Sequence, residues 1–347
     1  MHPLLRTLPF FLGAMTLLSA PSKFSDRPEV QAFIKTMANQ HRFDAKALET
    51  LLGGIQLQEE VIALVKPSPT ATVKNWRRYR ARCVEPARIR NGVEFWRTNA
   101  AALAKAEKEF GVPAEIIVAI LGVETHYGRS MGRFPVLPTL ATLAFDFPES
   151  PTKARRSALF LRELEEYLLL CRETNQDPTT FLGSYAGAIG IPQFLPSSIR
   201  AQAIDFDGDG RVDLRASVVD AIGSVARFLV AHGWEKGRPA LWPLSRGRAT
   251  LKAIKAKADG AAEPKWRMGE LLDAGIHPMT GISIKVFRKK EADTRVVIVD
   301  LPTPNRPTEY QLGLKNFYVI TRYNRSFFYA MSVLDLGSAL KRAKARR

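Results

Sequence analysis

One carboxyl group in the sequence is placed for acid–base chemistry. The segment VPAEIIVAILGVETHYGRSM, residues 112–131, is apolar nearly all round, which is the pattern of a buried helix. Glu124 lies near the end of this segment, one turn after aliphatic side chains. Because such surroundings remove hydration, we expect a raised pKa, as a general acid needs to protonate a glycosidic oxygen near neutral pH. The alternative is a structural carboxylate bonded to the backbone or to Arg129.

No second acid is evident near Glu124. Hydrolysis of a glycosidic bond by water normally uses two carboxyl groups that flank the bond. The closest acid is Asp146 in AFDFP, and its spacing does not determine whether it faces the same cleft. One carboxyl group suffices if the substrate supplies its own nucleophile, as the C6 hydroxyl of muramic acid can by closing a 1,6-anhydro ring onto C1. The same glutamate would first donate a proton and then accept one.

A second acidic group has the spacing of a calcium-binding loop. The segment DFDGDGRVD, residues 205–213, has acids at positions 1, 3 and 5, glycine at 6 and an apolar residue at 8. Alanine takes the place of the usual glutamate at position 12, so we expect a longer loop, 205–220. Carboxylates this close repel without a cation, which favours structural Ca²⁺ over a plain acidic surface turn. The predicted ligands are Asp205, Asp207, Asp209, Arg211 and Asp220.

The elements around these groups are predicted to be mostly helical, giving a mainly α (α+β) protein. Apolar residues at three- and four-residue spacing indicate helices over 28–66, 91–111, 154–173, 219–234 and 327–343. Short runs rich in β-branched and aromatic residues indicate a small antiparallel sheet from 282–287, 294–301 and 316–324.

The chain is strongly basic, with 51 Lys+Arg against 34 Asp+Glu and a formal charge of +17. Such a surface attracts nucleic acid, anionic lipid or an anionic polymer such as a bacterial wall. Nucleic acid is not expected as a partner, because no recognised binding motif is present. The densest cluster, residues 341–347, is interpreted as a solvated tail, with wall or lipid contact as the alternative.

The first twenty residues have the layout of a secretory signal. Arg6 precedes an apolar run from Leu8 to Leu18, and small residues follow. The run is short for a membrane span, and no cysteine stands there to carry a lipid. We therefore expect export to the periplasm, with a buried N-terminal helix as the alternative reading.

Two cysteines, Cys83 and Cys171, are present, and no CxxC pair that would suggest a metal site. The two could form a disulfide in an oxidising compartment. Cys171 lies in the apolar stretch EEYLLLCRE, so we interpret it as a buried free thiol.

Three long segments resemble the membrane-bound lytic murein transglycosylase B family. They are residues 114–148, residues 181–214 and residues 219–234, and NFYVITRYNRSFFYAMSVLDLG resembles the family's C-terminal part. The likeness runs from about Phe33 to Leu340. It implies a lysozyme-like helical core, an additional helical region and a small β region, and a calcium site with a longer loop. It also implies cleavage of peptidoglycan glycan strands with Glu124 as the acid/base.

The resemblance further implies substrate-binding roles for eight residues. Tyrosines could pack on sugar rings, and the hydroxyl of one could hydrogen-bond Glu124; arginines could pair with lactyl or peptide carboxylates. From the residues alone, an aromatic core is the favoured interpretation of the tyrosines. The alternatives for the others are a solvated helix face for the arginines, tight helix packing for the glycine-rich run and a turn for the asparagine. The residues are Tyr79, Arg155, Arg156, Ser184, Gln193, Tyr323, Asn324 and Tyr329. Leu159 departs from the family, which often has an aromatic or polar residue there.

Three functions remain open at this stage: a lytic transglycosylase, a muramidase that uses water, and a noncatalytic wall-binding protein. We expect a monomer that acts on glycan strands, and further partners among wall synthesis or remodelling proteins remain open. The expected segments are a signal at 1–20, an N-terminal helical region at 21–110, a lysozyme-like core at 111–237, a small β region at 238–325, and a C-terminal helix with a basic tail at 326–347.

Overall fold

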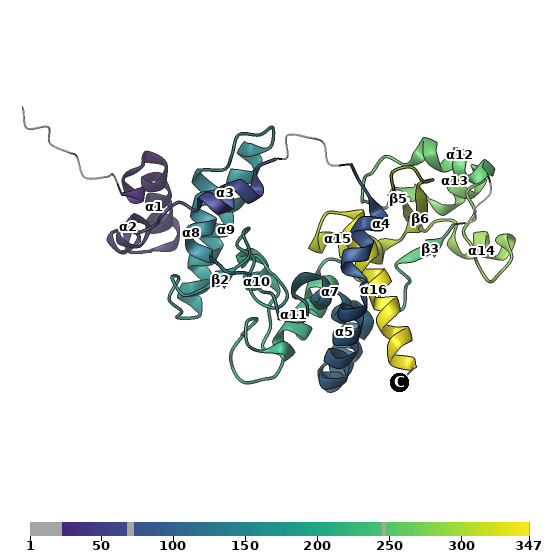
Figure 1. The fold of residues 1–347 in the computed structure, drawn as a ribbon, viewed down its shortest axis with the longest axis horizontal. Coiled ribbons are helices and arrows are strands. Elements are labelled where there is room, and N and C mark those ends of the chain that lie inside the picture. The colour runs from purple at the N-terminus through teal and green to yellow at the C-terminus, as the bar shows by residue number, and fades with distance from the viewer. Residues whose placement is uncertain (1–22, 68–72, 245–247, 347) are drawn as a thin grey trace, which may run out of the picture. The chain divides into compact units, whose positions relative to one another are not determined.

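The computed structural model describes residues 23–67, 73–244 and 248–346 (Figure 1). The chain divides into two compact units, Met1–Leu57 and Gln58–Arg347. The expected signal, residues 1–20, lies outside the described residues. Among the helices of those described ranges, none is long and apolar enough to cross a membrane. The boundary at residue 57 falls inside the segment 21–110, and the five-segment division stays a prediction.

The smaller unit is a short helical module. Asp44 begins its last helix by accepting a hydrogen bond from the Ala47 amide at 2.7 Å, as an N-cap does. Val30, Met37 and Leu52 are fully buried and form part of its core. Its elements are η1 (Phe24–Asp26), α1 (Pro28–His41) and α2 (Ala45–Gly53).

The larger unit is mostly helical, and its helices position the site. Its first ten helices in chain order are α3 (Glu59–Val65), α4 (Trp76–Cys83), α5 (Pro86–Thr98), α6 (Ala100–Phe110), α7 (Ala114–Thr125), α8 (Val136–Phe145), α9 (Lys153–Glu173), α10 (Pro196–Gln202), α11 (Val218–Ala231) and α12 (Arg248–Lys257). Four more follow: α13 (Met268–Asp273), α14 (Ile284–Glu291), α15 (Lys315–Tyr323) and α16 (Phe327–Ala345).

Helix α7 is the central helix of this unit, in contact with α5, α6, α11 and α16. Every residue from Ile116 to Gly122 is buried, which confirms the predicted buried helix. A glycine permits the closest approach of α16: a Cβ at Gly337 would lie 3.0 Å from the Glu115 backbone oxygen. The end of this packed helix is therefore a firm platform for a side chain.

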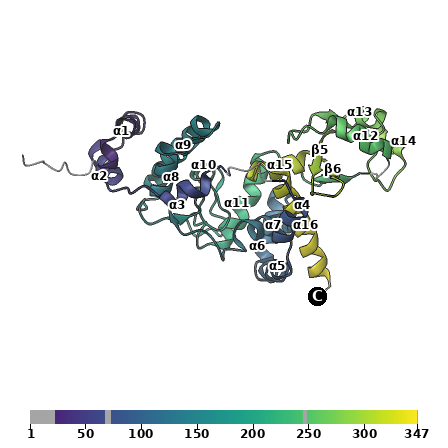
Figure 2. The ribbon, with the colours of Figure 1, turned by 45° about the horizontal axis from the view of Figure 1, so that its top comes forward.

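Two antiparallel sheets complete the described part of the unit. The small one pairs β1 (Phe134–Pro135) with β2 (Leu182–Gly183). The larger has the order β3-β6-β5-β4 and, with α12, α13 and α14, surrounds its own core, which includes Ile254, Leu271 and Ile298. In both views this group lies at one end of the unit and α8 and α9 at the other (Figures 1 and 2). Its strands are β3 (Leu241–Pro243), β4 (Trp266–Arg267), β5 (Arg295–Leu301) and β6 (Glu309–Gly313).

The strand prediction is only partly correct. The run 294–301 is confirmed as β5, but the run 282–287 enters helix α14. Ser283 starts that helix by accepting from the Val286 amide at 3.5 Å. A helix N-cap therefore outweighs the β-branched composition of the segment.

The run 316–324 is also wrong as a strand, because it forms helix α15. Phe317 and Ile320 are fully buried at helical spacing. Tyr318 and Arg322 lie one turn apart, with the guanidinium 4.1 Å from the ring centroid. Burial at a period of three to four residues decides the conformation, although the composition favours a strand.

Candidate active site

The carboxyl group of Glu124 lies in the last turn of α7, behind fully buried Ile120 and Leu121. Glu124 as a whole is only partly buried, so its carboxyl group stays within reach of a ligand. Burial raises the pKa of Glu124 from 4.5 to about 7, while a hydrogen bond from Tyr329 acts in the opposite direction. The carboxyl end of a helix also disfavours negative charge. The group therefore holds a proton close to neutral pH.

Three tyrosines from three helices are associated with this group, and one of them, Tyr329, contacts it directly. The Tyr329 hydroxyl donates to Glu124 Oε1 at 2.5 Å. The rings of Tyr323 and Tyr329 are nearly parallel, with centroids 6.3 Å apart, and the Tyr323 hydroxyl donates to the Pro192 carbonyl at 2.6 Å. Burial, and then the charges of Cys83 and Glu124, raise the pKa of Tyr79 to about 12. All three hydroxyls are therefore neutral, so they can hydrogen-bond to Glu124 or sugar without adding charge.

A strained turn follows the catalytic helix. His126, Tyr127 and Gly128 have φ angles of 51°, 64° and 86°, a conformation that costs about 1–3 kcal/mol for each non-glycine residue. The Thr125 hydroxyl accepts from the Gly128 amide at 2.9 Å and donates to the Ile191 carbonyl at 2.8 Å. Helix α7 thus ends at Thr125, directly before this turn.

Ser184 and Gln193 shape the backbone of a glycine-rich segment. Ser184 Oγ accepts from the Ala188 amide at 3.1 Å, and Gln193 donates to the Met131 carbonyl at 3.1 Å. A Cβ at Gly132 would lie 2.0 Å from the Gly183 oxygen, so only glycine permits this approach. These two side chains stabilise loops next to the turn that follows α7.

The other residues implied by the family resemblance lie on α9 and at the end of α15. Arg155 on α9 is exposed, and the Arg156 guanidinium lies 5.0 Å from the Phe160 ring centroid. Asn324 is exposed at the end of α15. Across the described ranges, no hydrogen bond or ion pair joins Arg155, Arg156 or Asn324 to Glu124. Their substrate roles stay predictions.

A second buried carboxyl group, Glu163 on α9, has a structural explanation. It accepts from the Ser197 amide at 2.9 Å and from the Ser197 hydroxyl at 2.7 Å, at the start of α10. Burial raises its pKa and both hydrogen bonds lower it. The shift of Glu124 has only two causes, burial and Tyr329. Within the described part of the chain, no second carboxyl group perturbs Glu124.

The acidic loop brings three carboxylates together. One ligand atom from each of Asp205, Asp207 and Asp209 lies within 4.8 Å of the other two. Backbone amides, that of Gly210 first, hold the pKa of Asp205 below its ordinary value. Ionised carboxylates at this spacing form the oxygen-rich donor set that Ca²⁺ prefers.

Asp220 holds the same loop from inside. It is 1% exposed, and its two carboxylate oxygens accept from the Phe206 and Asp213 amides, each at 2.8 Å. Arg211 is exposed. Asp220 therefore fixes the loop backbone, and direct ligation of a metal ion by Asp220 or Arg211 stays a prediction.

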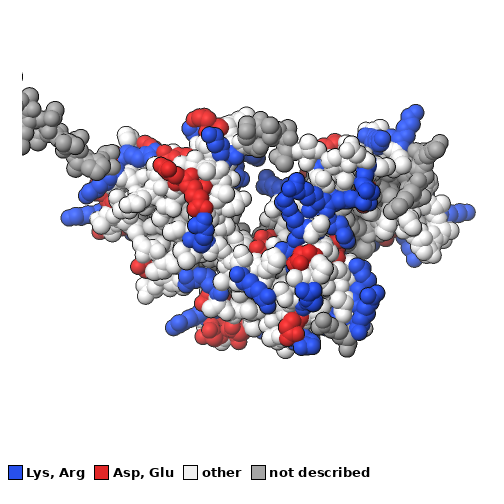
Figure 3. All heavy atoms as spheres, in the orientation of Figure 1, with Lys and Arg blue, Asp and Glu red and all other residues white. Residues whose placement is uncertain are grey.

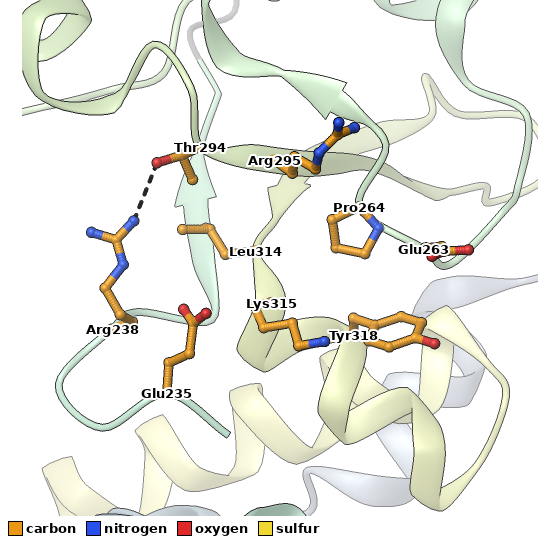
Figure 4. Close-up of a pocket in the computed structure, with 9 residues that line it drawn as sticks. All are labelled: Glu235, Arg238, Glu263, Pro264, Thr294, Arg295, Leu314, Lys315 and Tyr318. Atoms are coloured by element: carbon orange, nitrogen blue, oxygen red, sulfur yellow. Dashed lines mark hydrogen bonds between the residues drawn. The ribbon is translucent and has the colours of Figure 1, made fainter. Parts of the chain in front are cut away.

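A cavity of about 620 Å³ lies between α15 and the sheet, and Glu124 is not among the residues that line it (Figure 4). Arg238 at its edge is held by two hydrogen bonds to Glu291 at 3.0 and 2.9 Å, and the Lys315 nitrogen lies 5.1 Å from the Tyr318 ring centroid. Its lining mixes both charge signs and contains none of the tyrosines around Glu124. We therefore assign the chemistry to the carboxyl group on α7.

A proton-holding carboxyl group at the end of a central helix, in a mostly helical unit, is the arrangement of a lysozyme-like glycan-cleaving enzyme. Comparison with known proteins identifies the family within this class. A family model described as "Transglycosylase SLT domain" matches residues 25–338, and the chain belongs to this family. It is a peptidoglycan-cleaving lytic transglycosylase.

The relatives agree along nearly the whole chain. The sequence is 38% identical over 336 residues to the membrane-bound lytic murein transglycosylase B of Escherichia coli (strain K12), covering 93% of this chain and 85% of that protein. The fold is similar to soluble lytic transglycosylase SltB1 of Pseudomonas aeruginosa (TM-score 0.80, 39% identity, 92% of this chain and 100% of that chain). It is also similar to Escherichia coli Slt35 in complex with calcium (TM-score 0.78, 37% identity, 93% and 96%).

Proposed function

We propose that Glu124 is the single acid/base of this transglycosylase. The bond cut is the β-1,4 bond between N-acetylmuramic acid and N-acetylglucosamine, and the product carries a 1,6-anhydromuramic acid end. The supporting observation is one buried carboxyl group with a pKa of about 7, without a second carboxyl group acting on it among the residues described. An enzyme that directs water to the bond normally needs two.

The reaction uses one proton in a closed cycle. Protonated Glu124 donates its proton to the glycosidic oxygen as the bond from that oxygen to C1 of muramic acid breaks. The resulting carboxylate then accepts the proton of the C6 hydroxyl, whose oxygen forms the new bond to C1. Glu124 ends protonated, and water is neither consumed nor released. The low-polarity site favours the neutral acid at the start.

Tyr329 fixes the carboxyl group in this cycle. Its hydroxyl occupies Oε1 at 2.5 Å, so Oε2 carries and receives the proton. A hydroxyl donor stabilises the carboxylate formed after the first step more than the neutral acid. Tyr323 and Tyr79 would pack against sugar rings beside it. Ser184, Gln193, Arg155, Arg156 and Asn324 would contribute further substrate contacts.

Mass spectrometry of digested sacculi tests the proposal. The wild type should release muropeptides one water lighter than hydrolytic products, and Glu124→Gln should release none. Glu115→Gln is the matched control, since it makes the same change at the other end of α7, where Glu115 pairs with Lys341 at 2.8 Å, and it should keep activity. Products with reducing ends would establish the hydrolytic alternative instead, and intact wall binding without cleavage by the wild type would favour a binding protein.

We propose a structural Ca²⁺ in the loop 205–220. The three clustered aspartates support this, and a related structure, Slt35, is a calcium complex. Removal of Ca²⁺ should lower the melting temperature of the wild type, and added Ca²⁺ should restore it. Asp207→Asn should weaken this response, whereas an unchanged melting temperature with and without chelator would contradict the site.

We propose a periplasmic location for the enzyme, because residues 1–20 have the layout of a signal and its substrate lies there. Cell fractionation checks this: the full chain should reach the periplasm, and a variant lacking residues 1–20 should stay in the cytoplasm. We also propose that it acts as a monomer, which sedimentation checks. Wall-synthesis or remodelling proteins as further partners remain to be tested by cross-linking in cells.

A further inference from the structure

A line of positive charge follows one side of helix α4. Arg78 and Arg82 are four residues apart in this helix, and Lys74 lies four residues before Arg78. Like charges at this spacing destabilise a helix. Arg78 is also in the first turn, where the helix dipole disfavours a cation. The last turn, which holds Arg82, favours a cation, but helix stability does not explain Lys74 or Arg78.

The helix that carries them is firmly held by other residues. Trp76 is 2% exposed, and its amide donates to the Pro302 carbonyl at 2.8 Å. The Asn75 side chain accepts from the Arg78 amide at 3.0 Å. Arg80 on the same helix is neutralised by Asp335 at 2.5 Å. The structure thus uses one arginine of α4 internally and holds the rest of the helix rigid.

The three cations have no such use. Lys74, Arg78 and Arg82 are exposed, and within the described part of the chain none of them has an acidic side chain within 4.0 Å. Figure 3 shows Lys and Arg side chains gathered where Figure 1 places α4, beside a hollow in this face. Their full charge is therefore available to an anion.

These side chains line one groove that adjoins the catalytic site. The groove has a volume of about 580 Å³ and contains no acidic residue in its lining. Tyr79 and Phe328 form its apolar part, with ring centroids 5.6 Å apart. Phe328 directly precedes Tyr329 in α16, and the Tyr329 hydroxyl donates to Glu124 at 2.5 Å. The groove therefore adjoins the residue that holds the reacting carboxyl group.

We propose that this groove binds the carboxylates of the stem peptide attached to the muramic acid residue being cut. This rests on the proposed function. The sugar rings are uncharged, and the lactyl carboxyl group becomes an amide when it carries a peptide, so the carboxylates of the substrate lie on the peptide. The peptide starts on the same sugar whose C1 reacts, so it must leave the catalytic site along an adjacent surface. Guanidinium groups bind such carboxylates in bidentate geometry.

Kinetics on matched strands test this proposal. The substrates are glycan strands with stem peptides and the same strands after amidase removal of the peptides. For the wild type, kcat/KM should be higher with peptides, and this preference should shrink as salt increases. Arg78→Ala and Arg82→Ala should each reduce the ratio of the two kcat/KM values by about tenfold, mainly through KM. Arg82→Lys should retain part of the ratio.

Arg77→Ala is the control, because Arg77 is an exposed arginine of the same helix that lines a different cavity, and it should keep the wild-type ratio. Equal losses on both strands, or an unaltered ratio in all variants, would overturn the peptide site. Loss of binding to anionic lipid vesicles with an unaltered ratio would assign the cations to a membrane instead. Failure of the wild type to give anhydro products from either strand would refute the proposed function, not the groove alone.

Discussion

Replacing Glu124 by glutamine should stabilise the protein, in a pH-dependent way, while it removes activity. The folded state raises the pKa of this group from 4.5 to about 7. Between these values the folded protein holds a proton that the unfolded chain has lost. The free energy of unfolding therefore falls as pH rises from about 4.5 to 7, and it falls no further above pH 7 on account of this group.

The size of the effect follows from the shift. A change from 4.5 to about 7, at about 1.4 kcal/mol per pKa unit, corresponds to roughly 3 kcal/mol. Glutamine does not titrate, and its side-chain oxygen can still accept the hydrogen bond of Tyr329. Glu124→Gln should thus match the wild type near pH 4 and exceed it by up to about 3 kcal/mol at pH 8.

Urea unfolding at pH 4, 6 and 8 measures this difference. Glu173→Gln supplies a control of opposite sign, because hydrogen bonds from Arg200 lower the pKa of Glu173. Its stability contribution is present above the unfolded pKa and lost as pH falls, so this variant should be less stable than the wild type at pH 8. If the difference for Glu124→Gln were independent of pH, or if the wild type were the more stable protein at pH 8, the raised pKa of Glu124 in the folded protein would be refuted.

Three further outcomes follow from the same geometry. Tyr329→Phe removes a hydrogen bond that lowers the pKa of Glu124, so the basic limb of the pH–rate profile should move above pH 7 and kcat should fall about tenfold; an unmoved limb would contradict the contact. Gly132→Ala places a Cβ 2.0 Å from a backbone oxygen at a φ of 94° and should lower the melting temperature by several degrees, as calorimetry can check. Thiol titration should find Cys83 reactive in the folded protein and buried Cys171 reactive only after unfolding. If the two cysteines formed a disulfide, neither would react, even in the unfolded protein.

The buried helix was predictable because its evidence is local. An all-round apolar pattern with one acid near its end identifies both α7 and Glu124. The clustering of Asp205, Asp207 and Asp209 was equally predictable, because the three aspartates lie within five residues of the sequence. Burial then acts on Glu124 as the sequence suggests, and its pKa rises.

The tyrosines around Glu124 were not predictable from spacing. Tyr79 belongs to α4 and Tyr329 to α16, and their contact with the site depends on how distant helices pack. The family resemblance named these positions, and the 2.5 Å hydrogen bond from Tyr329 gives one of them a physical role. The strand predicted over 316–324 was wrong for a similar reason, because burial against neighbouring helices outweighed a composition typical of strands.

Two features of the structure oppose local stability, and Tyr79 lines the groove that carries the second. One is a carboxyl group forced into apolar surroundings, and the other is a line of like charges on α4. A cation in contact with Glu124 would hold it ionised and remove the general acid, and no cation contributes to its shift. Tyr79 lines the groove of the arginines and is itself uncharged, with a pKa of about 12, so it adds no positive charge near the acid. Burial is what raises the pKa of Glu124, so replacing Tyr79 with a smaller residue that admits water should lower this pKa, and the pH–rate profile would move to lower pH.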